Sequence, residues 1–298
     1  MTKQTKATLA AMLGYSIFGF SFLFSKIALE MASPFILLAV RFVAAFLVMN
    51  ILRLTGLVQV SLKGKPVGLL MMMGLVHPVI YFICETYGIA MTTAAFSGIM
   101  IGMAPVFGLI FGVLFLKERC SALQVVFTVC SVIGAAMTTT GGVGKVPAAG
   151  FFLLLGALIC SSLLPILSRK IADHFSAFER TYVMFAFGSI TFTAIALFQN
   201  AGDLSAITEP LSQGKFWISI LYLAVASSVV AFLSINYSAT HIPAGRTIIF
   251  SNCVPVISVL AGIFIMGDSF TAVQLLGIAI IVISVFGVSH PGKKAVKP

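Results

Sequence analysis

The sequence predicts an all-α membrane protein with ten transmembrane helices arranged as two inverted five-helix repeats. Two observations carry this prediction: extreme apolarity and a segment that recurs along the chain. The chain is 60% hydrophobic and only 9% charged, with a mean hydropathy of +1.13, whereas ordinary globular domains carry about 25% charged residues. Charge-free runs such as Ala7–Ser25 and Thr86–Leu116 reach the roughly 20 apolar residues that a membrane span requires.

The recurring segment covers residues 87–134, and its second copy begins 150 positions downstream. Glu118 falls on Asp268 at that spacing, which keeps the charge type, and no gap is needed. Five helices in each copy is an odd number, so the second copy enters the membrane from the opposite side, as in many secondary transporters. We therefore divide the chain into a first repeat, 1–144, and a second, inverted repeat, 145–298, with Gly141–Gly144 as the break. The residues repeated identically are Tyr87, Ala94, Ile99, Pro105, Val106, Gly112, Ala122, Gln124, Val132 and Ile133.

Helix boundaries follow from apolar length and from proline. We treat the apolar stretch after the polar start as the first span, because it is too long for a signal-peptide core. Prolines 34, 66, 147 and 243 stand at or just before helix starts, where the missing N–H costs little. The longest expected loop is 199–214. The expected spans are 7–29, 34–54, 67–90, 93–115, 121–140, 148–168, 178–198, 215–239, 243–266 and 271–289.

The basic residues predict the orientation of these helices. With the N-terminus in the cytoplasm, the inner segments hold fourteen Lys and Arg residues and the outer segments hold four. Both termini are then cytoplasmic, and the protein is expected in the bacterial inner (plasma) membrane. The net charge of +10 is mostly this inward bias, so it predicts no nucleic-acid partner.

Several motifs resemble the drug/metabolite transporter superfamily, EamA type, over nearly the whole chain. They are Phe18-Gly19-Phe20-Ser21-Phe22 with Lys26, then Pro34 with Arg41-Phe42, and Pro105-Val106-Phe107 leading into Leu116-Lys117-Glu118-Arg119. The chain departs from the family by lacking the usual first-motif Trp, by Ser21 where Asn is frequent, and by Gly267-Asp268 in place of Gly-Glu. The resemblance implies an exporter or exchanger of amino acids, metabolites or drugs, similar to bacterial exporters of aromatic amino acids.

The third expected helix carries the main candidate site. His77, Tyr81 and Glu85 are spaced four residues apart, which puts them on one face. Pro78 frees the carbonyl of Gly74 and predicts a kink. Charged groups inside a bilayer are functional candidates by default, so Glu85 is a candidate partner for an ammonium group or a proton carrier. The alternative is that Glu85 lies hydrated or structurally paired near the outer helix end.

Other polar residues lie near predicted helix breaks. Gly102 before Pro105 and Asn252 before Pro255 occupy matching positions of the two repeats, and such broken helices point to a binding site. Polar residues that bind ligand can equally serve as contacts between helices. Arg41 and Lys26 are candidates for a substrate carboxylate or for structural pairing with Glu30. The further substrate-binding candidates are Ser21, Ser25, Asn236, Tyr237, Ser251 and Asn252.

The sequence therefore predicts a secondary transporter that exports small metabolites, preferably amino acids, by alternating access. An exchanger of nucleotide-linked or phosphorylated metabolites, or an exporter of drug-like compounds, is the alternative. The sequence has no P-loop and no nucleophile–base arrangement, so we expect neither ATP-driven pumping nor an enzyme. The cysteine spacing suggests no metal or redox site, and no cofactor is expected. The expected partners are a small-molecule substrate and the lipid bilayer, with the protein a monomer or a weak dimer.

Overall fold

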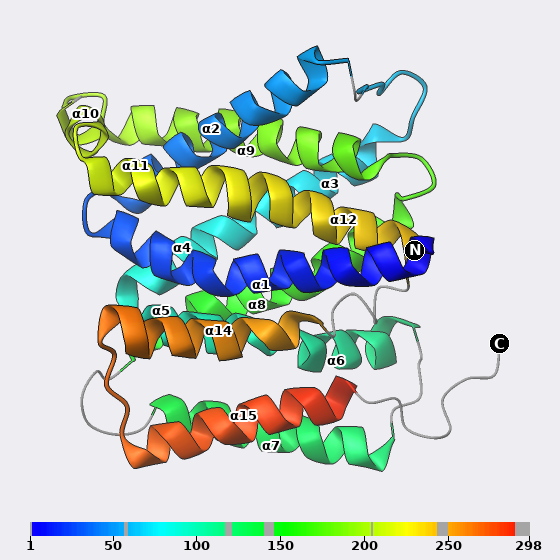
Figure 1. The fold of residues 1–298 in the computed structure, drawn as a ribbon, viewed down its shortest axis with the longest axis vertical. Helices are drawn as coiled ribbons and strands as arrows, with labels where there is room; N and C mark the ends of the chain where they lie inside the picture. The colour runs from blue at the N-terminus through cyan, green and yellow to red at the C-terminus, as the bar shows by residue number, and fades with distance from the viewer. Residues whose placement is uncertain are drawn as a thin grey trace.

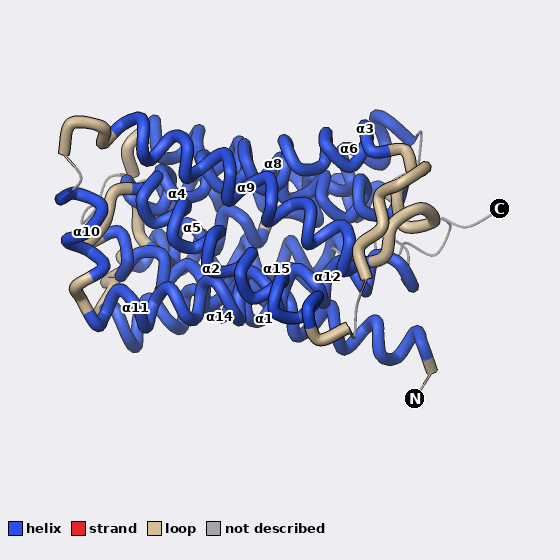
Figure 2. Tube along the Cα trace, turned by 90° about the horizontal axis from the view of Figure 1, so that it is seen from above, coloured by secondary structure: helices blue, strands red, loops and turns tan. Residues whose placement is uncertain are grey.

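The computed structural model describes residues 2–56, 59–116, 121–139, 146–203, 205–242 and 250–289, and every regular element in these residues is a helix. The helices lie side by side, and their connections gather at two opposite ends (Figure 1, Figure 2). One end holds Glu30 and Thr92, and we call it the Lys26 end. The other holds the start of the first helix and the end of α12, and we call it the Arg169 end. The Gly141–Gly144 boundary, Lys117-Glu118-Arg119 and Pro243 lie outside the described residues.

The first two helices begin at clear sequence signals. Helix α1 (Lys3–Leu29) starts four residues before the expected span, because Thr2 caps it by accepting the N–H of Thr5 at 3.2 Å. Helix α2 (Pro34–Leu54) has Pro34 in its first turn, after Ser33 in an extended conformation. The rest of the first half contains α3 (Val67–Gly74), the π-helical η1 (Leu75–Ile80), α4 (Tyr81–Met91), α5 (Ala94–Gly102), α6 (Ala104–Leu116) and α7 (Ala122–Thr139).

In the second half, a capping box starts α9, in which Ser176 and Glu179 satisfy each other's backbone N–H groups. The expected loop 199–214 contains the short helix that begins at Ser205. The carboxylate of Asp203, just before this helix, accepts hydrogen bonds from the backbone N–H and the hydroxyl of Ser205. The elements are α8 (Ala148–Lys170), α9 (Ala177–Gln199), α10 (Ser205–Leu211), α11 (Gly214–Leu221), the π-helical η2 (Tyr222–Val230), α12 (Ala231–His241), η3 (Phe250–Asn252), α14 (Cys253–Ala261), the π-helical η4 (Gly262–Met266) and α15 (Ala272–Ser289).

Seven helices within the described residues are long and apolar enough to cross a membrane. The fifth, ninth and tenth expected spans appear as the shorter apolar stretches Val125–Gly134, Phe250–Met266 and Ala272–Gly287. Large apolar side chains are exposed on the outside of the bundle, among them Phe198 at 85%. Such a surface suits lipid rather than water. The seven helices are Lys3–Leu29, Pro34–Leu54, Val67–Met91, Ala94–Phe111, Ala148–Lys170, Ala177–Gln199 and Gly214–His241.

Helices from the two halves pack against each other in reciprocal pairs. Helix α1 packs on α12 and α4 packs on α8, while α2 pairs with α9, α5 with α14, and α7 with α15. Figure 1 shows α7 and α15 together along one edge of the bundle. Small residues bring the pairs close: a Cβ on Gly98 would lie 2.0 Å from Ser258 Oγ, and one on Gly102 would lie 2.3 Å from Pro255 Cδ. These glycines, four residues apart on α5, therefore let the neighbouring helix α14 approach closely.

Candidate functional site

The third span is broken at its centre by His77 and Pro78. His77 has φ −142° and ψ 104°, which is not helical, and Pro78 follows it inside η1. Proline removes one helical hydrogen bond and clashes with the carbonyl four residues earlier, so the break is expected there. The His77 ring stacks on Tyr81 with centroids 4.1 Å apart and meets Phe232 edge-on at 5.2 Å. The break thus turns an imidazole into the core, where its Nδ1 has no hydrogen-bond partner among the described residues.

Glu85 lies one helical turn beyond Tyr81 and is 3% exposed. Its Oε1 accepts the hydroxyl of Tyr81 at 2.9 Å. Its Oε2 has no hydrogen-bond partner among the described residues. A buried carboxylate oxygen without a partner costs free energy, so this atom can bind a ligand donor at little further desolvation cost.

Arg41, in the first half of α2, is buried to 2% exposure. Its Nε donates to Ser228 Oγ and its Nη2 to Ser227 Oγ, both at 3.1 Å. The alternative pairing of Arg41 with Glu30 is not found, because the guanidinium has no carboxylate within 4.0 Å among the described residues. Within the described parts of the chain, the ion pair that meets a 4.0 Å limit joins Lys65 to Glu179. Arg41 is therefore a buried cation held by neutral hydroxyls.

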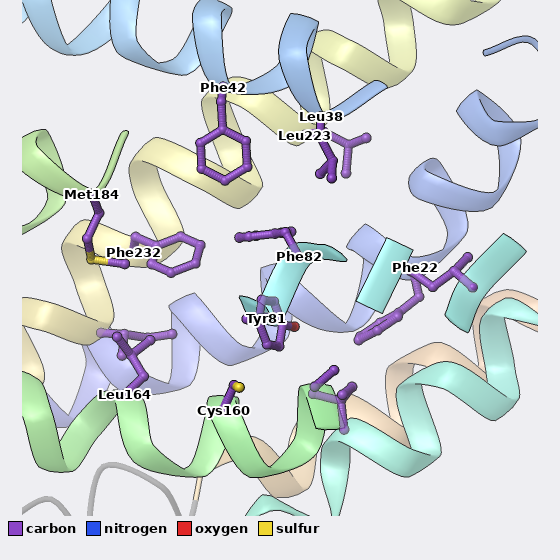
Figure 3. Close-up of a cluster of buried hydrophobic side chains, with 14 of the residues drawn as sticks. Phe22, Leu38, Phe42, Tyr81, Phe82, Cys160, Leu164, Met184, Leu223 and Phe232 are labelled. Carbon is purple, nitrogen blue, oxygen red and sulfur yellow. The ribbon is translucent and has the colours of Figure 1, made fainter. Parts of the chain in front are cut away.

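A small cavity of about 20 Å³ lies between the central helices, with room for about one water molecule. Aromatic side chains dominate the surrounding core, where the Phe82 ring lies beside Tyr81 and also contacts Phe42 and Phe232 (Figure 3). Ser251 Oγ borders the cavity and has no hydrogen-bond partner among the described residues. The walls are formed by Tyr15, Phe18, Phe22, His77, Tyr81, Ile101, Ala104, Ser161, Leu164, Ile235, Ser251 and Val254.

The remaining predicted residues are distributed around this centre. Ser21 donates to the carbonyl of Phe18 in its own helix, and Ser25 is buried on the same helix. Asn236 is fully buried nearer the Arg169 end, where its amide binds Ser168 and Thr181.

Two further candidates lie outside the cavity wall. The ring of Tyr237 lies 4.3 Å from that of His241. Asn252 is 3% exposed at the end of η3. Only His77, Tyr81 and Ser251 among the predicted binding residues line the central cavity, and Glu85 joins them through its bond to Tyr81.

The predicted kink residues mark changes of helix type. Pro78 lies in the π-helical η1, and Gly102 ends α5 just before the junction at Met103. Pro105 lies in the first turn of α6 and Pro255 in the first turn of α14.

Our candidate set omitted the two serines that hold Arg41. Residues 227 and 228 lie 150 positions after His77 and Pro78, and they belong to the π-helical η2. Phe232 likewise repeats Phe82 at this spacing. Extending the repeat comparison toward the N-terminus of each copy identifies Phe232, whereas Ser227 and Ser228 align with residues of a different type and carry no repeat signal.

A second cavity, of about 250 Å³, lies at the Lys26 end between α5 and α15. Asp268, on its wall, donates its backbone N–H to Gly262 and leaves Oδ2 without a hydrogen-bond partner among the described residues. Burial raises the pKa of the Asp268 carboxyl, against opposing effects of the Ala95 N–H and the Lys26 cation. No group of three potential metal-binding side chains occurs within the described ranges.

Comparisons with known proteins agree with this architecture. The model of the EamA-like transporter family matches residues 5–140 and again 148–290. The chain is 34% identical to the uncharacterized transporter YcxC of Bacillus subtilis, over 96% of this chain and 93% of that protein. It is 26% identical to the uncharacterized transporter YetK of the same organism, over 95% and 87%. A crystal structure at 18% identity shares the fold, with a TM-score of 0.67 over 95% of this chain and 97% of the other. The chain belongs to the EamA-like transporter family, as its motifs indicate.

Proposed function

We propose that this transporter exports small metabolites, with amino acids as the preferred class, across the bacterial inner membrane by alternating access. The observation that carries the substrate class is the pair of buried opposite charges, Arg41 and Glu85. Arg41 is bound by hydroxyls, while Glu85 has one bonded and one unbonded oxygen. Buried charges are costly unless they are matched, so a pair left unbridged favours a ligand that carries both signs.

A free amino acid has the matching chemistry. Its carboxylate suits the planar, multi-donor guanidinium of Arg41, and its ammonium group suits Glu85 Oε2. The stacked His77 and Tyr81 rings and the neighbouring Phe232 offer an apolar surface to a bulky side chain. The cavity of about 20 Å³ is too small for any amino acid, so binding requires the surrounding helices to separate.

The proposal includes ten membrane-crossing helices in two inverted repeats, 1–144 and 145–298. Three findings support it: the family model matches the chain twice, the helices of the two halves pair reciprocally, and π-helical segments recur at corresponding positions. The basic residues Arg53, Lys65 and Lys170 gather at the Arg169 end, which favours that end as the cytoplasmic one. We propose a monomer or weak dimer without a nucleic-acid partner, cofactor or enzymatic activity.

The alternative substrates have less support. A phosphorylated or nucleotide-linked metabolite needs several cations facing one cavity, and the buried Lys and Arg side chains of the described residues are Arg41 and Arg180. Arg180 already binds the Asn236 carbonyl and the Thr240 hydroxyl near the Arg169 end. A drug-like cation would use Glu85 and leave Arg41 without a role.

Counterflow in proteoliposomes tests the proposal. Vesicles loaded with mixed amino acids should take up labelled amino acids, and Glu85→Gln and Arg41→Met should each reduce uptake by about tenfold or more, because each removes a charged partner. Glu209→Gln is the matched control, since Glu209 is exposed in the short helix α10. Uptake of no amino acid by folded wild-type protein would refute the substrate class. Decarboxylated analogues that exchange as well as the parent amino acids would refute the role of Arg41.

A further inference from the structure

A lysine joins two helices of the first half at one end of the bundle. Lys26, near the end of α1, donates through Nζ to the carbonyl oxygens of Ile89 at 3.0 Å, Ala90 at 3.4 Å and Thr92 at 2.5 Å. These carbonyls close α4, where the last turn of a helix lacks internal partners and attracts positive charge. Lys26 thus fastens α1 to the end of α4.

An arginine makes the equivalent contact in the second half. Arg169, near the end of α8, donates through Nη1 to the carbonyl oxygens of Ala239 at 3.2 Å and Thr240 at 2.6 Å. These are the positions 150 residues after Ile89 and Ala90, and they close α12. The triplet Lys26-Ile27-Ala28 recurs as Lys170-Ile171-Ala172, and Arg169 directly precedes this second copy. The same type of contact therefore occurs twice, once at each end of the molecule.

The four helices joined in this way surround the central cavity. Helix α1 packs along α12 and α4 along α8, so the core contains two pairs drawn from different halves. Lys26 connects the two pairs at one end of the bundle, and Arg169 connects them at the other. With both contacts formed, the cavity between the pairs measures about 20 Å³.

We propose that these two contacts, the Lys26 clamp and the Arg169 clamp, are the gates that close the central site toward either side of the membrane. This inference rests on the alternating access proposed above, and it adds the residues that control it. Opening one end separates the two helix pairs there, which breaks the clamp at that end and leaves the other formed. The structure, with both clamps closed, is then the occluded state.

The polar contacts that support each clamp differ in number and in the helices they join. At the Arg169 end, Arg180 binds the carbonyl of Asn236 at 2.8 Å and the hydroxyl of Thr240 at 2.5 Å, and it also donates to the carbonyl of Ser168. These bonds link α8 to α12 through α9, whereas at the Lys26 end the hydroxyl of Thr92 bonds to Gly88 of α4 and Ser97 of α5 and, among the described residues, does not reach α1. The Lys26 end therefore has fewer cross-links and should open more readily when its clamp is removed.

Accessibility of a cysteine in the cavity wall tests this proposal without any substrate. In a background with the five native cysteines replaced by alanine, Ser161→Cys provides a half-buried reporter on α8. Its labelling by a membrane-impermeant maleimide is followed in right-side-out and inverted vesicles. Single cysteines at the exposed Thr5 and Ser212, introduced in separate variants, identify the face of the membrane on which each end lies.

Lys26→Met should raise the labelling rate about tenfold from the Lys26 end only, as expected for the loss of a charge-assisted contact. Arg169→Met should raise it about threefold from the Arg169 end only, because Arg180 remains there. The exposed cations Lys215 and Lys170 lie at the same two ends, so Lys215→Met and Lys170→Met are matched controls that should leave both rates unchanged. Thermal unfolding of each variant confirms that the protein is folded.

The clamp proposal would be overturned if labelling became faster from the opposite end or from both ends. It would also be overturned if labelling became faster from neither end. The test is separable from the substrate proposal, because labelling rates do not require transport. If no amino acid were taken up in counterflow but labelling were end-specific, the amino-acid proposal would be refuted and the clamp proposal supported. If amino acids were taken up normally but neither Lys26→Met nor Arg169→Met changed the labelling rates, the clamp proposal would be refuted and the amino-acid proposal supported.

Discussion

The guanidinium carbon of Arg41 lies 4.5 Å from the centroid of the Phe82 ring, over its face. A cation in this position is attracted by the negative face of the ring. Phe82 itself is fixed by edge-to-face contact with Phe42, with centroids 4.9 Å apart. The hydroxyls of Ser227 and Ser228 complete the surroundings, so the guanidinium is fixed in place without a bonded carboxylate among the described residues.

Removing both hydroxyls should destabilise the protein without changing its helices. Ser227→Ala combined with Ser228→Ala leaves buried guanidinium donors unbonded, which should lower the free energy of unfolding by about 2–3 kcal/mol and the thermal midpoint by roughly 5–10 °C. Ser219→Ala is the matched control, because Ser219 is buried nearby and donates to the Lys215 carbonyl of its own helix. Thermal unfolding in detergent measures both, and equal shifts would contradict the role of the serine pair.

The contact between α5 and α14 has no room for a methyl group at Gly98. A Cβ there would lie 2.0 Å from Ser258 Oγ and 2.2 Å from Ser258 Cβ, so Gly98→Ala should cost about 1–3 kcal/mol of stability. Adding Ser258→Gly should restore part of this loss by removing both clashing atoms. Gly68→Ala, at a helical glycine with open space around it, should be neutral or slightly stabilising. A thermal midpoint unchanged by Gly98→Ala would contradict the close approach.

Asp268 should make stability depend on pH in the direction opposite to most carboxylates. Burial raises its pKa above the ordinary value of 3.8, so the folded protein binds this proton more tightly than the unfolded chain. The resulting stabilisation is complete below about pH 4 and is lost as pH rises through the raised pKa. Relative to the wild type, Asp268→Asn should therefore gain stability between pH 4 and pH 7 in thermal unfolding.

Asp203 provides the control of opposite sign. Hydrogen bonds from the Ser205 hydroxyl and N–H lower the pKa of the Asp203 carboxyl. Its stabilisation is present above the ordinary pKa and is lost as pH falls through the lowered one. Asp203→Asn should lose stability relative to the wild type at pH 7 and recover at acid pH. The same sign of pH dependence for both variants would show that neither effect comes from these carboxyl groups.

The sequence predicts the helical membrane fold and the family because both depend on local patterns. Apolar length predicts the spans, and the helix start at Pro34 follows from the rigid ring of proline. The break at His77 follows from Pro78 in the same way. The candidate face of His77, Tyr81 and Glu85 also rests on local helical spacing, and the structure brings the three together.

The partners across the bundle were beyond local reasoning. Arg41 meets Ser227 and Ser228 from a position more than half the chain away, and no spacing rule within one helix encodes that contact. Asn236 was predicted to bind substrate, but a buried amide in a span can bond to a ligand or to a neighbouring helix equally well. Its bonds to Ser168 and Thr181 depend on how three helices pack, which residue type alone does not determine.

The reciprocal packing of the two halves has a consequence for biogenesis. Because α1 lies against α12 and α4 against α8, each half supplies the surface that the other half needs. A ribosome that has finished only the first half has inserted helices whose main partners do not yet exist. Assembly of the core must therefore wait for synthesis of the second half. The contacts that complete the core join residues far apart in the sequence, and contacts of this kind form slowly in folding. Separately expressed halves should be unstable alone and recover when they are produced together.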